Sequence, residues 1–326
     1  MTLPAPPDHA VAPLLSVVIP AHNEALGIEH TLTVIEAILN QAQVSHQLIV
    51  VDDGSRDGTF DRLTQLTVRF PQLLGLRLSR NFGKEAALLA GLRAAQGAAV
   101  VTLDADLQHP PEIIPQMLET WRAGARVVHG VKQDRTIDSP LSRARASIFN
   151  GIMSRLGGVD LQDASDFKLL DRVVVDILTR SLPERGRFYR GLASWVGFRQ
   201  SQVQFKVAER HDHTPGRWSL VALVRLANIA IVSFTSAPLQ LVTLLGLSTL
   251  VFGILVGFEV LWTWWHGQAV SGATTIILTL LILGSFIMIS LGIIGTYLAK
   301  IYDEIKGRPP YFIEASCGGT PPARPT

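Results

Sequence analysis

The stretch Leu14-Leu-Ser-Val-Val-Ile-Pro20 is a short apolar run, rich in β-branched residues and ended by proline. Its length and composition are typical of a buried strand. Directly after it, Asn23 and Glu24 open a helical pattern in which apolar side chains recur through Leu39. A buried strand followed by an amphipathic helix predicts the first unit of an α/β fold.

The same alternation continues through the first third of the chain. Further strands are expected at 48–51, 74–78 and 98–103, with helices around 60–66 and over 84–95. Strands that alternate with helices predict a mostly parallel sheet covered on both faces. Polar side chains follow three of these strands, at the edge where open α/β sheets bind ligands.

Two common nucleotide-binding motifs are missing from the sequence. It contains no Gly-x-Gly-x-x-Gly dinucleotide fingerprint and no Gly-Lys-Ser/Thr phosphate loop. A nucleotide bound at this edge would therefore be held in another way. Acidic residues at strand ends can accept hydrogen bonds from a base and a ribose. A divalent cation held by carboxylates can neutralise a diphosphate.

The triplet Asp104-Ala-Asp106 directly follows the fourth expected strand. Residues two apart in an extended segment point the same way, so both carboxylates can face one cation. Gln108 is a further candidate ligand or phosphate contact. His109 is expected to be a loop residue, because magnesium prefers oxygen ligands. The alternative is that the triplet forms an ordinary turn on the solvated surface.

Two long apolar stretches, 239–262 and 274–299, contain a single charged residue, Glu259. Each is long enough to cross a bilayer core, which takes about 20 residues of helix. Tryptophans near the end of the first stretch lie where it would meet the membrane interface. Glu259 is close enough to that end to reach water, with an intramembrane functional acid as the alternative. Buried core helices of a soluble protein are the other interpretation of both stretches.

The basic residues around these stretches predict an orientation. The connection at 264–275 has no lysine or arginine, whereas Lys300, Lys306 and Arg308 follow the second stretch. Positive residues stay on the cytoplasmic side of a membrane. We therefore expect a two-pass protein of the inner (plasma) membrane, with the large first domain and both termini in the cytoplasm.

The remaining composition excludes other classes of protein. The net charge of +2 is nearly balanced and gives no sign of a nucleic-acid binder. The proline- and alanine-rich lead, residues 1–13, lacks the apolar core of a signal peptide and is expected to be disordered, as is the tail after Ser316. The single cysteine, Cys317, excludes an internal disulfide and is interpreted as incidental.

Four motifs together resemble those of the family 2 glycosyltransferases: Val17-Val-Ile-Pro-Ala-His-Asn-Glu24, Val50-Val-Asp-Asp-Gly-Ser55, Ser79-Arg-Asn-Phe-Gly-Lys84 and Asp104-Ala-Asp-Leu-Gln-His-Pro-Pro111. More narrowly, the chain is similar to the polyprenyl-phosphate glycosyltransferases, a group that includes dolichyl-phosphate mannose synthase and bacterial undecaprenyl-phosphate glucosyl and aminoarabinosyl transferases. The resemblance runs from about Leu14 to Phe312.

The resemblance implies a GT-A fold and a metal-dependent, inverting transfer of a sugar from a UDP- or GDP-linked donor, with Mg²⁺ or Mn²⁺ as cofactor. It implies polyprenyl phosphate and the lipid bilayer as partners. The nucleotide contacts carried over by match are Pro20, Ala21, Glu24, Asp53, Lys84 and Asp104. The implied metal site is Asp104, Asp106 and Gln108, and Asp106 is also assigned a catalytic role. Asp52 is interpreted as structural.

The acceptor side is expected farther along the chain. Ser165-Asp-Phe-Lys-Leu-Leu-Asp-Arg172 resembles the family segment that carries the acceptor-side acid. Asp166 is the first choice for that catalytic role and Asp163 the second, with a helix start and its acidic first turn as the alternative. Four arginines are assigned to the acceptor phosphate or, compatibly, to a positive membrane flank: Arg187, Arg190, Arg210 and Arg217.

One segment departs from the family pattern. Relatives carry an arginine followed by Gly-x-Ser-Lys and an aromatic residue, whereas this chain has Arg210-His-Asp-His-Thr-Pro-Gly-Arg-Trp218, with one extra residue and arginine for lysine. The cation and the aromatic residue are retained, but the register of this loop stays open.

The predicted organisation is a lead (1–13), a GT-A domain (14–216), a juxtamembrane amphipathic helix (217–236), two transmembrane helices (237–300) and a cytoplasmic tail (301–326). A helix packed on the soluble domain is the alternative for 217–236. A processive polysaccharide synthase is a rival function that needs more membrane helices, and a non-catalytic scaffold or flippase subunit would not need the acids. Glycine-containing spans allow a homo-oligomer. The sequence does not specify the sugar.

Overall fold

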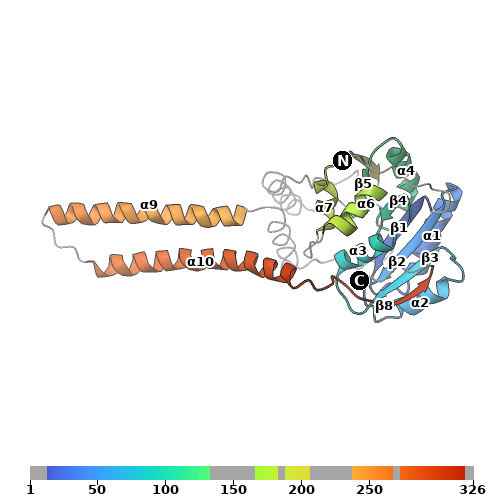
Figure 1. Cartoon of the computed structure of the whole chain (residues 1–326), viewed down its shortest axis with the longest axis horizontal. Coiled ribbons are helices and arrows are strands. Elements are labelled where there is room, and N and C mark those ends of the chain that lie inside the picture. Colours follow the sequence, from blue (N-terminus) through green and yellow to red (C-terminus); the bar gives the residue numbers. More distant parts are fainter. Residues whose placement is uncertain (1–12, 133–165, 183–187, 206–236, 267–271, 320–326) are drawn as a thin grey trace. The chain divides into compact units, whose positions relative to one another are not determined.

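The structure is a computed structural model that describes residues 13–132, 166–182, 188–205, 237–266 and 272–319. The chain divides into two compact units, one containing the sheet and the other the two long C-terminal helices. Figure 1 labels most of the elements of both units. Several predictions lie outside the described residues: the lead up to residue 12, Asp163, Arg187, Arg210, Arg217 and the helix at 217–236.

Within the described residues, eight strands form one sheet in the order β7-β5-β6-β4-β1-β2-β3-β8. Their bounds are β1 (Leu15–Ala21), β2 (His46–Asp52), β3 (Leu73–Leu78), β4 (Ala99–Thr102), β5 (Val127–Lys132), β6 (Lys168–Asp171), β7 (Gln200–Phe205) and β8 (Ile313–Gly318). β4, β1, β2 and β3 are parallel, as are β5 and β7, whereas β6 and β8 pair antiparallel with their neighbours. This confirms the predicted mostly parallel sheet.

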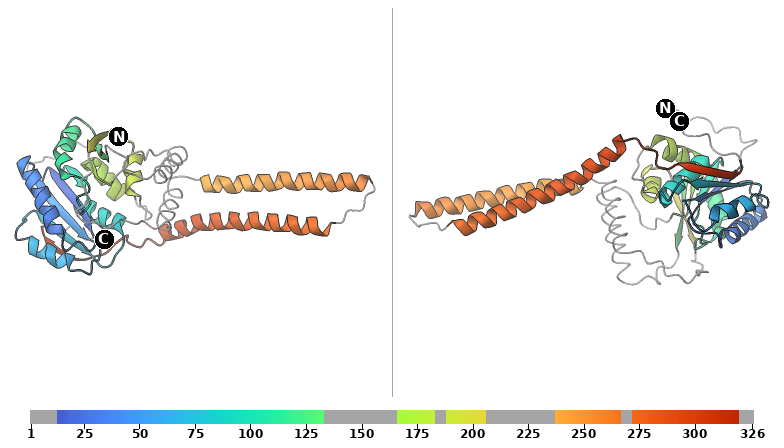
Figure 2. Two further views of the ribbon diagram at one scale, coloured as in Figure 1. Left: turned by 180° about the vertical axis from the view of Figure 1, so that it is seen from behind. Right: turned by 90° about the horizontal axis from the view of Figure 1, so that it is seen from below.

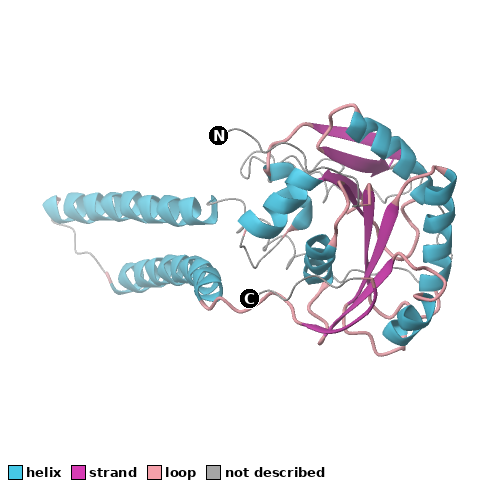
Figure 3. Cartoon of the chain, turned by 45° about the vertical axis from the view of Figure 1, so that its right-hand side comes forward, coloured by secondary structure: helices cyan, strands magenta, loops and turns pink. Residues whose placement is uncertain are grey.

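Helices cover both faces of this sheet (Figures 2 and 3). Their bounds are α1 (Ile28–Gln41), α2 (Thr59–Leu66), α3 (Lys84–Ala94), α4 (Ile114–Arg122), α6 (Arg172–Asp176) and α7 (Tyr189–Trp195), with a 3-10 turn, η1 (Pro111–Ile113), and a π-helical turn, η2 (Ile177–Ser181). α1, α2 and α4 contribute to one buried apolar cluster with the strands, and α3 packs on the opposite face of β1 and β2.

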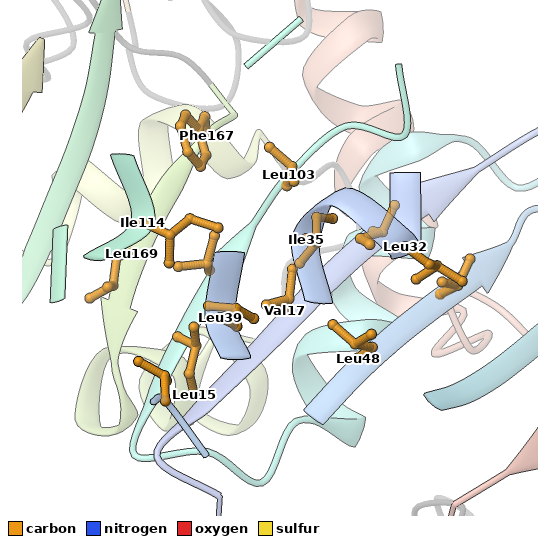
Figure 4. Close-up of a cluster of buried hydrophobic side chains, with 14 of the residues drawn as sticks. Leu15, Val17, Leu32, Ile35, Leu39, Leu48, Leu103, Ile114, Phe167 and Leu169 are labelled. Carbon is orange, nitrogen blue, oxygen red and sulfur yellow. The ribbon is translucent and has the colours of Figure 1, made fainter. Parts of the chain in front are cut away.

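The first face of the sheet carries the main core. On β1, Leu15 and Val17 contribute to it because alternate residues of a strand point to the same side. On α1, Leu32, Ile35 and Leu39 recur at helical spacing and are fully buried against them. Figure 4 shows these side chains meeting between the helix and the strands. The core thus follows directly from the two apolar periods in the sequence.

On the other face, the close contact between α3 and the sheet depends on Gly91. A Cβ atom at this position would lie 2.3 Å from Cγ1 of Val18 on β1. We expect Gly91→Ala to lower the free energy of unfolding by about 1–3 kcal/mol, because over-packing outweighs the gain in helix propensity. Denaturant unfolding of the full chain in detergent measures the change.

A matched glycine provides the control for this substitution. At Gly27, before α1, a Cβ atom would meet its nearest neighbour, Oε2 of Glu24, at 3.6 Å, which is an ordinary contact. Gly27 is the N-cap of α1, where glycine is modestly preferred to alanine, so Gly27→Ala should lower the free energy of unfolding by only about 0.5 kcal/mol. Equal effects of the two substitutions would contradict the packing assigned to Gly91.

The last strand, β8, differs from the sequence-based expectation. The tail after Ser316 was predicted to be disordered, and this is wrong as far as Gly318, because these residues pair with β3. Cys317 lies opposite Gly75, where the absence of a side chain makes room for the sulfur atom. β8 belongs to the sheet unit and not to the helical unit. An edge strand is only half buried, so its sequence carries no continuous apolar run.

The described part of the second unit consists of two long helices, α9 (Ala237–Trp265) and α10 (Ala273–Ile305). Both are long and apolar enough to cross a membrane. Most of their described large apolar side chains are exposed, and none of the most apolar window of either helix is buried. This exposure argues against the alternative of core helices in a soluble protein.

Candidate active site

The candidate site lies at the edge of the sheet where β1, β2, β3 and β4 end. Because these strands are parallel, the loops that follow them gather at one edge. Pro20 and Ala21 are the last residues of β1, and Glu24 follows them. The backbone N–H of Glu24 donates to Oγ1 of Thr59, 3.0 Å away at the start of α2. The loops after β1 and β2 are thereby joined.

The turn after β2 is shaped by a buried acid and a glycine. Asp52 is fully buried, and its carboxylate accepts a hydrogen bond of 2.9 Å from the backbone N–H of Ser55. Gly54 has a φ of +65°, and a Cβ atom there would lie 2.4 Å from the carbonyl carbon of Arg80. Asp52 and Gly54 therefore turn the strand end against the loop after β3, which is the structural role expected of Asp52.

Asp53 connects the same turn to the start of α3. Its two carboxylate oxygens accept hydrogen bonds from the backbone N–H groups of Phe82 (2.7 Å) and Gly83 (2.9 Å). These bonds hold the loop directly before Lys84, the first residue of α3. Asp53 thus positions Lys84, and the nucleotide contact expected of Asp53 stays a prediction.

Four charged side chains from separate parts of the chain form one ion-paired group, the strand-edge cluster (Lys84, Asp104, Asp166 and Arg190). Nζ of Lys84 lies 2.6 Å from Oδ1 of Asp104 and 2.6 Å from Oδ2 of Asp166. Arg190, on α7, grips Asp166 through two bonds, from Nε to Oδ1 (2.6 Å) and from Nη2 to Oδ2 (2.9 Å). The charges alternate in sign, so each acid faces a cation.

Asp166 is the most deeply buried member of this cluster. Its side chain is 10% exposed, against 41% for Lys84 and 42% for Arg190. Burial opposes its charged form, but hydrogen bonds and charges from Arg190 and Lys84 outweigh burial and hold the pKa of Asp166 well below its usual range. Asp166 is therefore a carboxylate at neutral pH, while the two cations remain accessible to an anionic ligand.

The alternative that Asp166 lies in the acidic first turn of a helix is wrong. Asp166 precedes strand β6, and the helix α6 begins only at Arg172. The acid that caps this helix is Asp171, which accepts a hydrogen bond of 3.0 Å from the backbone N–H of Val173.

The predicted metal ligands lie in the loop that follows β4. Asp106 is exposed, and its Oδ1 accepts a hydrogen bond of 3.2 Å from the backbone N–H of Gln108. Leu107, between them, has a φ of +53°, which is uncommon for a residue with a large side chain and is typical of functional loops. The loop is therefore held in a specific, strained conformation.

These residues fit a cation whose coordination is completed by the phosphates of a bound substrate. No group of three or more His, Cys, Asp and Glu side chains that could hold a metal occurs within the described residues. Asp104 and Asp106 nevertheless offer carboxylate oxygens, and Mg²⁺ is commonly held by one or two carboxylates together with substrate phosphates. The donor set suits a magnesium- or manganese-type ion bound together with a diphosphate.

His109 occupies the structural position expected for it. Its ring packs against Phe167 and Phe205, with centroid distances of 5.4 Å and 5.6 Å. Only 9% of the residue is exposed. His109 therefore anchors the loop after β4 to the core, close to where the chain passes from Asp166 into β6.

Three residues next to the cluster were missed by the sequence interpretation: Glu85, Lys168 and Tyr189. Glu85 accepts a hydrogen bond of 2.9 Å from the backbone N–H of Tyr189. Lys168 is fully buried on β6 and donates to the carbonyl oxygen of Arg190 at 3.1 Å. A lysine at the start of the apolar stretch Lys168–Asp171 was the available signal, because a fully buried lysine is rare without a partner.

The protonation of Glu85 makes stability depend on pH. Burial raises the pKa of Glu85 from 4.5 to about 7, so the folded state binds a proton that the unfolded state has released between these values. We expect the unfolding temperature of the wild type to fall relative to that of Glu85→Gln as the pH rises from about 4.5 to about 7, and then to keep a constant difference. Thermal unfolding of both proteins in detergent across this pH range measures the difference in unfolding temperature. A difference that does not change with pH would contradict the raised pKa of Glu85.

The family follows from the sheet, the site and the sequence together. Residues 16–180 match the family model of glycosyl transferase family 2. The chain belongs to this family, and the predicted glycosyltransferase with a GT-A fold is confirmed.

Particular relatives match along nearly the whole chain. An uncharacterized glycosyltransferase of Synechocystis is 37% identical over 92% of this chain and 94% of its own length. An uncharacterized glycosyltransferase of Bacillus subtilis is 35% identical over 93% and 94%. A prophage-derived bactoprenol glucosyl transferase of Shigella flexneri is 34% identical over 94% and 99%. Among solved structures, a glucosyl-3-phosphoglycerate synthase from Mycobacterium tuberculosis in complex with UDP is 22% identical, with a TM-score of 0.46, over 69% of this chain and 80% of that chain.

Proposed function

We propose that this chain transfers a sugar from a UDP- or GDP-linked donor to a polyprenyl phosphate such as undecaprenyl phosphate. The main support is the strand-edge cluster, which places two accessible cations beside two acids at the edge of the sheet where the parallel strands end. The same chain carries two apolar helices able to cross a membrane. A relative named bactoprenol glucosyl transferase is 34% identical over nearly its whole length.

The proposed reaction is a single displacement. A phosphate oxygen of the acceptor forms a bond to the anomeric carbon of the sugar, and the bond from this carbon to the nucleoside diphosphate breaks, so the configuration inverts. The acceptor phosphate already carries a charge of about −1.5 to −2 at pH 7 and needs no strong base. Asp166, with its low pKa, is a weak base and instead orients the groups around it.

The cations of the cluster have distinct proposed roles. Lys84 lies beside Asp104, so it can contact the donor diphosphate. Arg190 presents a planar guanidinium, which suits a phosphate in two-point contact. Alignment of two anions at one carbon is unfavourable without such cations, and holding reactants in place supplies much of the rate. The contacts of Pro20, Ala21, Glu24 and Asp53 with the nucleoside are part of this proposal.

The cofactor is proposed to be Mg²⁺ or Mn²⁺, since members of the GT-A class typically use a divalent metal. Asp104 and Asp106 would hold the ion, with Gln108 as a further ligand or phosphate contact. When bound, it would supply positive charge that stabilises the departing diphosphate.

The membrane arrangement is also part of the proposal. α9 and α10 each cross the inner membrane, and the sheet domain lies on the cytoplasmic side, as expected from Lys300, Lys306 and Arg308 after the second span. This places the site where a cytoplasmic nucleotide sugar and a membrane lipid can both reach it. The proposal also includes a juxtamembrane amphipathic helix at residues 217–236. It assigns Arg187, Arg210 and Arg217 to the acceptor phosphate.

A transfer assay tests the function directly. The full chain in detergent is given a panel of radiolabelled UDP- and GDP-sugars with polyprenyl phosphate and Mn²⁺. The expected result is label in the organic phase for one donor, dependent on the lipid phosphate. Label in a long polysaccharide would favour a processive synthase, and no transfer from any donor would favour a non-catalytic scaffold; either result would overturn the proposal.

A further inference from the structure

The helix that carries Arg190 cannot hold its own position. α7 contains 7 residues, and isolated helices this short are unstable in water. Arg190 is its second residue, and its guanidinium must meet Asp166 in a defined two-point geometry. The contacts that fix the first turn of α7 therefore decide where this cation lies.

Two charged side chains outside the cluster hold the backbone of this turn. The carboxylate of Glu85 accepts the N–H of Tyr189, the first residue of α7, at 2.9 Å. The ammonium group of Lys168 donates to the carbonyl oxygen of Arg190 itself at 3.1 Å. Glu85 belongs to α3, the helix that also carries Lys84. Lys168 is the first residue of β6, the strand that begins two residues after Asp166. The first turn of α7 is therefore attached to both elements.

The side chain of Tyr189 makes further contacts that hold this turn. The ring of Tyr189 lies within 5.5 Å of Nζ of Lys168, and its hydroxyl pairs with Oγ1 of Thr102 at 2.9 Å. Thr102 in turn donates to the backbone carbonyl oxygen of Asp166. The same network thus contacts the backbone of Arg190 and the backbone of Asp166.

The environment of Glu85 and Lys168 makes their charges costly. Glu85 borders a small cavity lined by leucines of α3, η2 and α7. Lys168 has no exposed surface. Burial raises the pKa of Glu85 to about 7 and lowers the pKa of Lys168 to about 7. Neither group is required for solubility, and apolar side chains would fill these places at less cost.

We propose that Glu85 and Lys168 are positioning residues that hold the first turn of α7, and with it the Arg190 guanidinium, in register with Asp166 for the transfer reaction. The proposal rests on the proposed function and adds to it two residues that touch neither donor nor acceptor. Their effect passes through the backbone of Tyr189 and Arg190.

Two substitutions at Glu85 separate positioning from charge. Glu85→Gln removes the charge but keeps an oxygen at the same reach for the N–H of Tyr189. Glu85→Asp keeps the charge but withdraws it by one methylene. We expect kcat to stay within about 3-fold in Glu85→Gln and to fall by about 100-fold in Glu85→Asp, because a displacement of about 1 Å in a catalytic group can cost this much. The KM for the nucleotide sugar should stay within about 3-fold in both.

A readout without substrate accompanies the kinetics. Hydrogen exchange of the backbone amides of α7 should be faster in Glu85→Asp and in Lys168→Met than in the wild type, and unchanged in Glu85→Gln. Lys168→Met removes the donor at similar length, and it decides the question by the same two readouts if Glu85→Asp does not fold. If the wild type makes no lipid-linked sugar, the proposed function fails, and the exchange comparison still decides whether these residues hold α7.

Asp171→Asn is the matched control. Asp171 is a buried acid that, like Glu85, accepts an N–H at the start of a helix, but it lies at the opposite end of β6 from Lys168. Its substitution should lower stability without changing kcat or the exchange of α7. The proposal is overturned if Glu85→Asp keeps full kcat while Glu85→Gln loses it, if α7 exchanges at the wild-type rate in both Glu85→Asp and Lys168→Met, or if Asp171→Asn reproduces their kinetic loss.

Discussion

Replacing Asp106 with alanine is expected to lower kcat by about 10³-fold while the fold stays intact. Asp106 is exposed and contacts the described chain through one hydrogen bond to its own loop, so its loss removes little packing. Its proposed contribution is to hold a cation that stabilises the leaving diphosphate, an effect worth several kcal/mol in the transition state. Transfer of radiolabelled sugar to polyprenyl phosphate measures the loss.

An exposed acid elsewhere on the same domain provides the control for Asp106→Ala. Glu119 lies on α4 and is exposed, away from the ends of the parallel strands. Glu119→Ala should keep kcat within about 2-fold of the wild type, since surface substitutions away from a site change little. Full activity of Asp106→Ala would refute the metal assignment.

Replacing Asp166 with asparagine is expected to lower kcat by about 10² to 10⁴-fold, with nucleotide binding retained. This substitution removes the charge that faces both Lys84 and Arg190. The cations would then lose their common partner, and the alignment of the acceptor with the sugar would be lost. Steady-state kinetics combined with titration of the nucleoside diphosphate separate this effect from a defect in donor binding.

The pairing also predicts how Asp166 responds to acid. Because Arg190 and Lys84 hold the pKa of Asp166 below its usual range, its folded-state charge is present above the ordinary value and is lost only as the pH falls well below it. Its loss of charge should therefore not limit activity between pH 5 and 8.

Asp176→Asn is the control for Asp166→Asn, since Asp176 pairs with Arg172 outside the cluster. Wild-type kcat in Asp166→Asn would contradict its assigned role.

The sequence was sufficient for the first four strands, for the helices between them and for the edge of the sheet that carries the site. The apolar run before Pro20 predicts a buried strand, and the helical spacing of the apolar residues that follow predicts a helix. The acids Asp104 and Asp106 stand directly after such a run, so their place at a strand end was predictable. Asp166 was found through resemblance to the family.

The contacts within the site were not predictable in the same way. Lys84 meets Asp166 only because β6 pairs antiparallel with β4, and no periodicity in the sequence specifies that pairing. Glu85 and Lys168 act through the backbone of α7, and such a contact leaves no motif. β8 was missed because an edge strand needs little apolar surface, and its partner β3 is distant in sequence.

The acids after β4 are proposed to hold a divalent ion on the diphosphate of the donor. Calorimetric titration of UDP and GDP into the full chain, with and without Mn²⁺, tests this metal site most directly. We expect one nucleotide to bind the wild type and Asp166→Asn only when Mn²⁺ is present, and this binding to be lost in Asp106→Ala. Equally tight binding without metal, or metal-dependent binding that survives in Asp106→Ala, would contradict it.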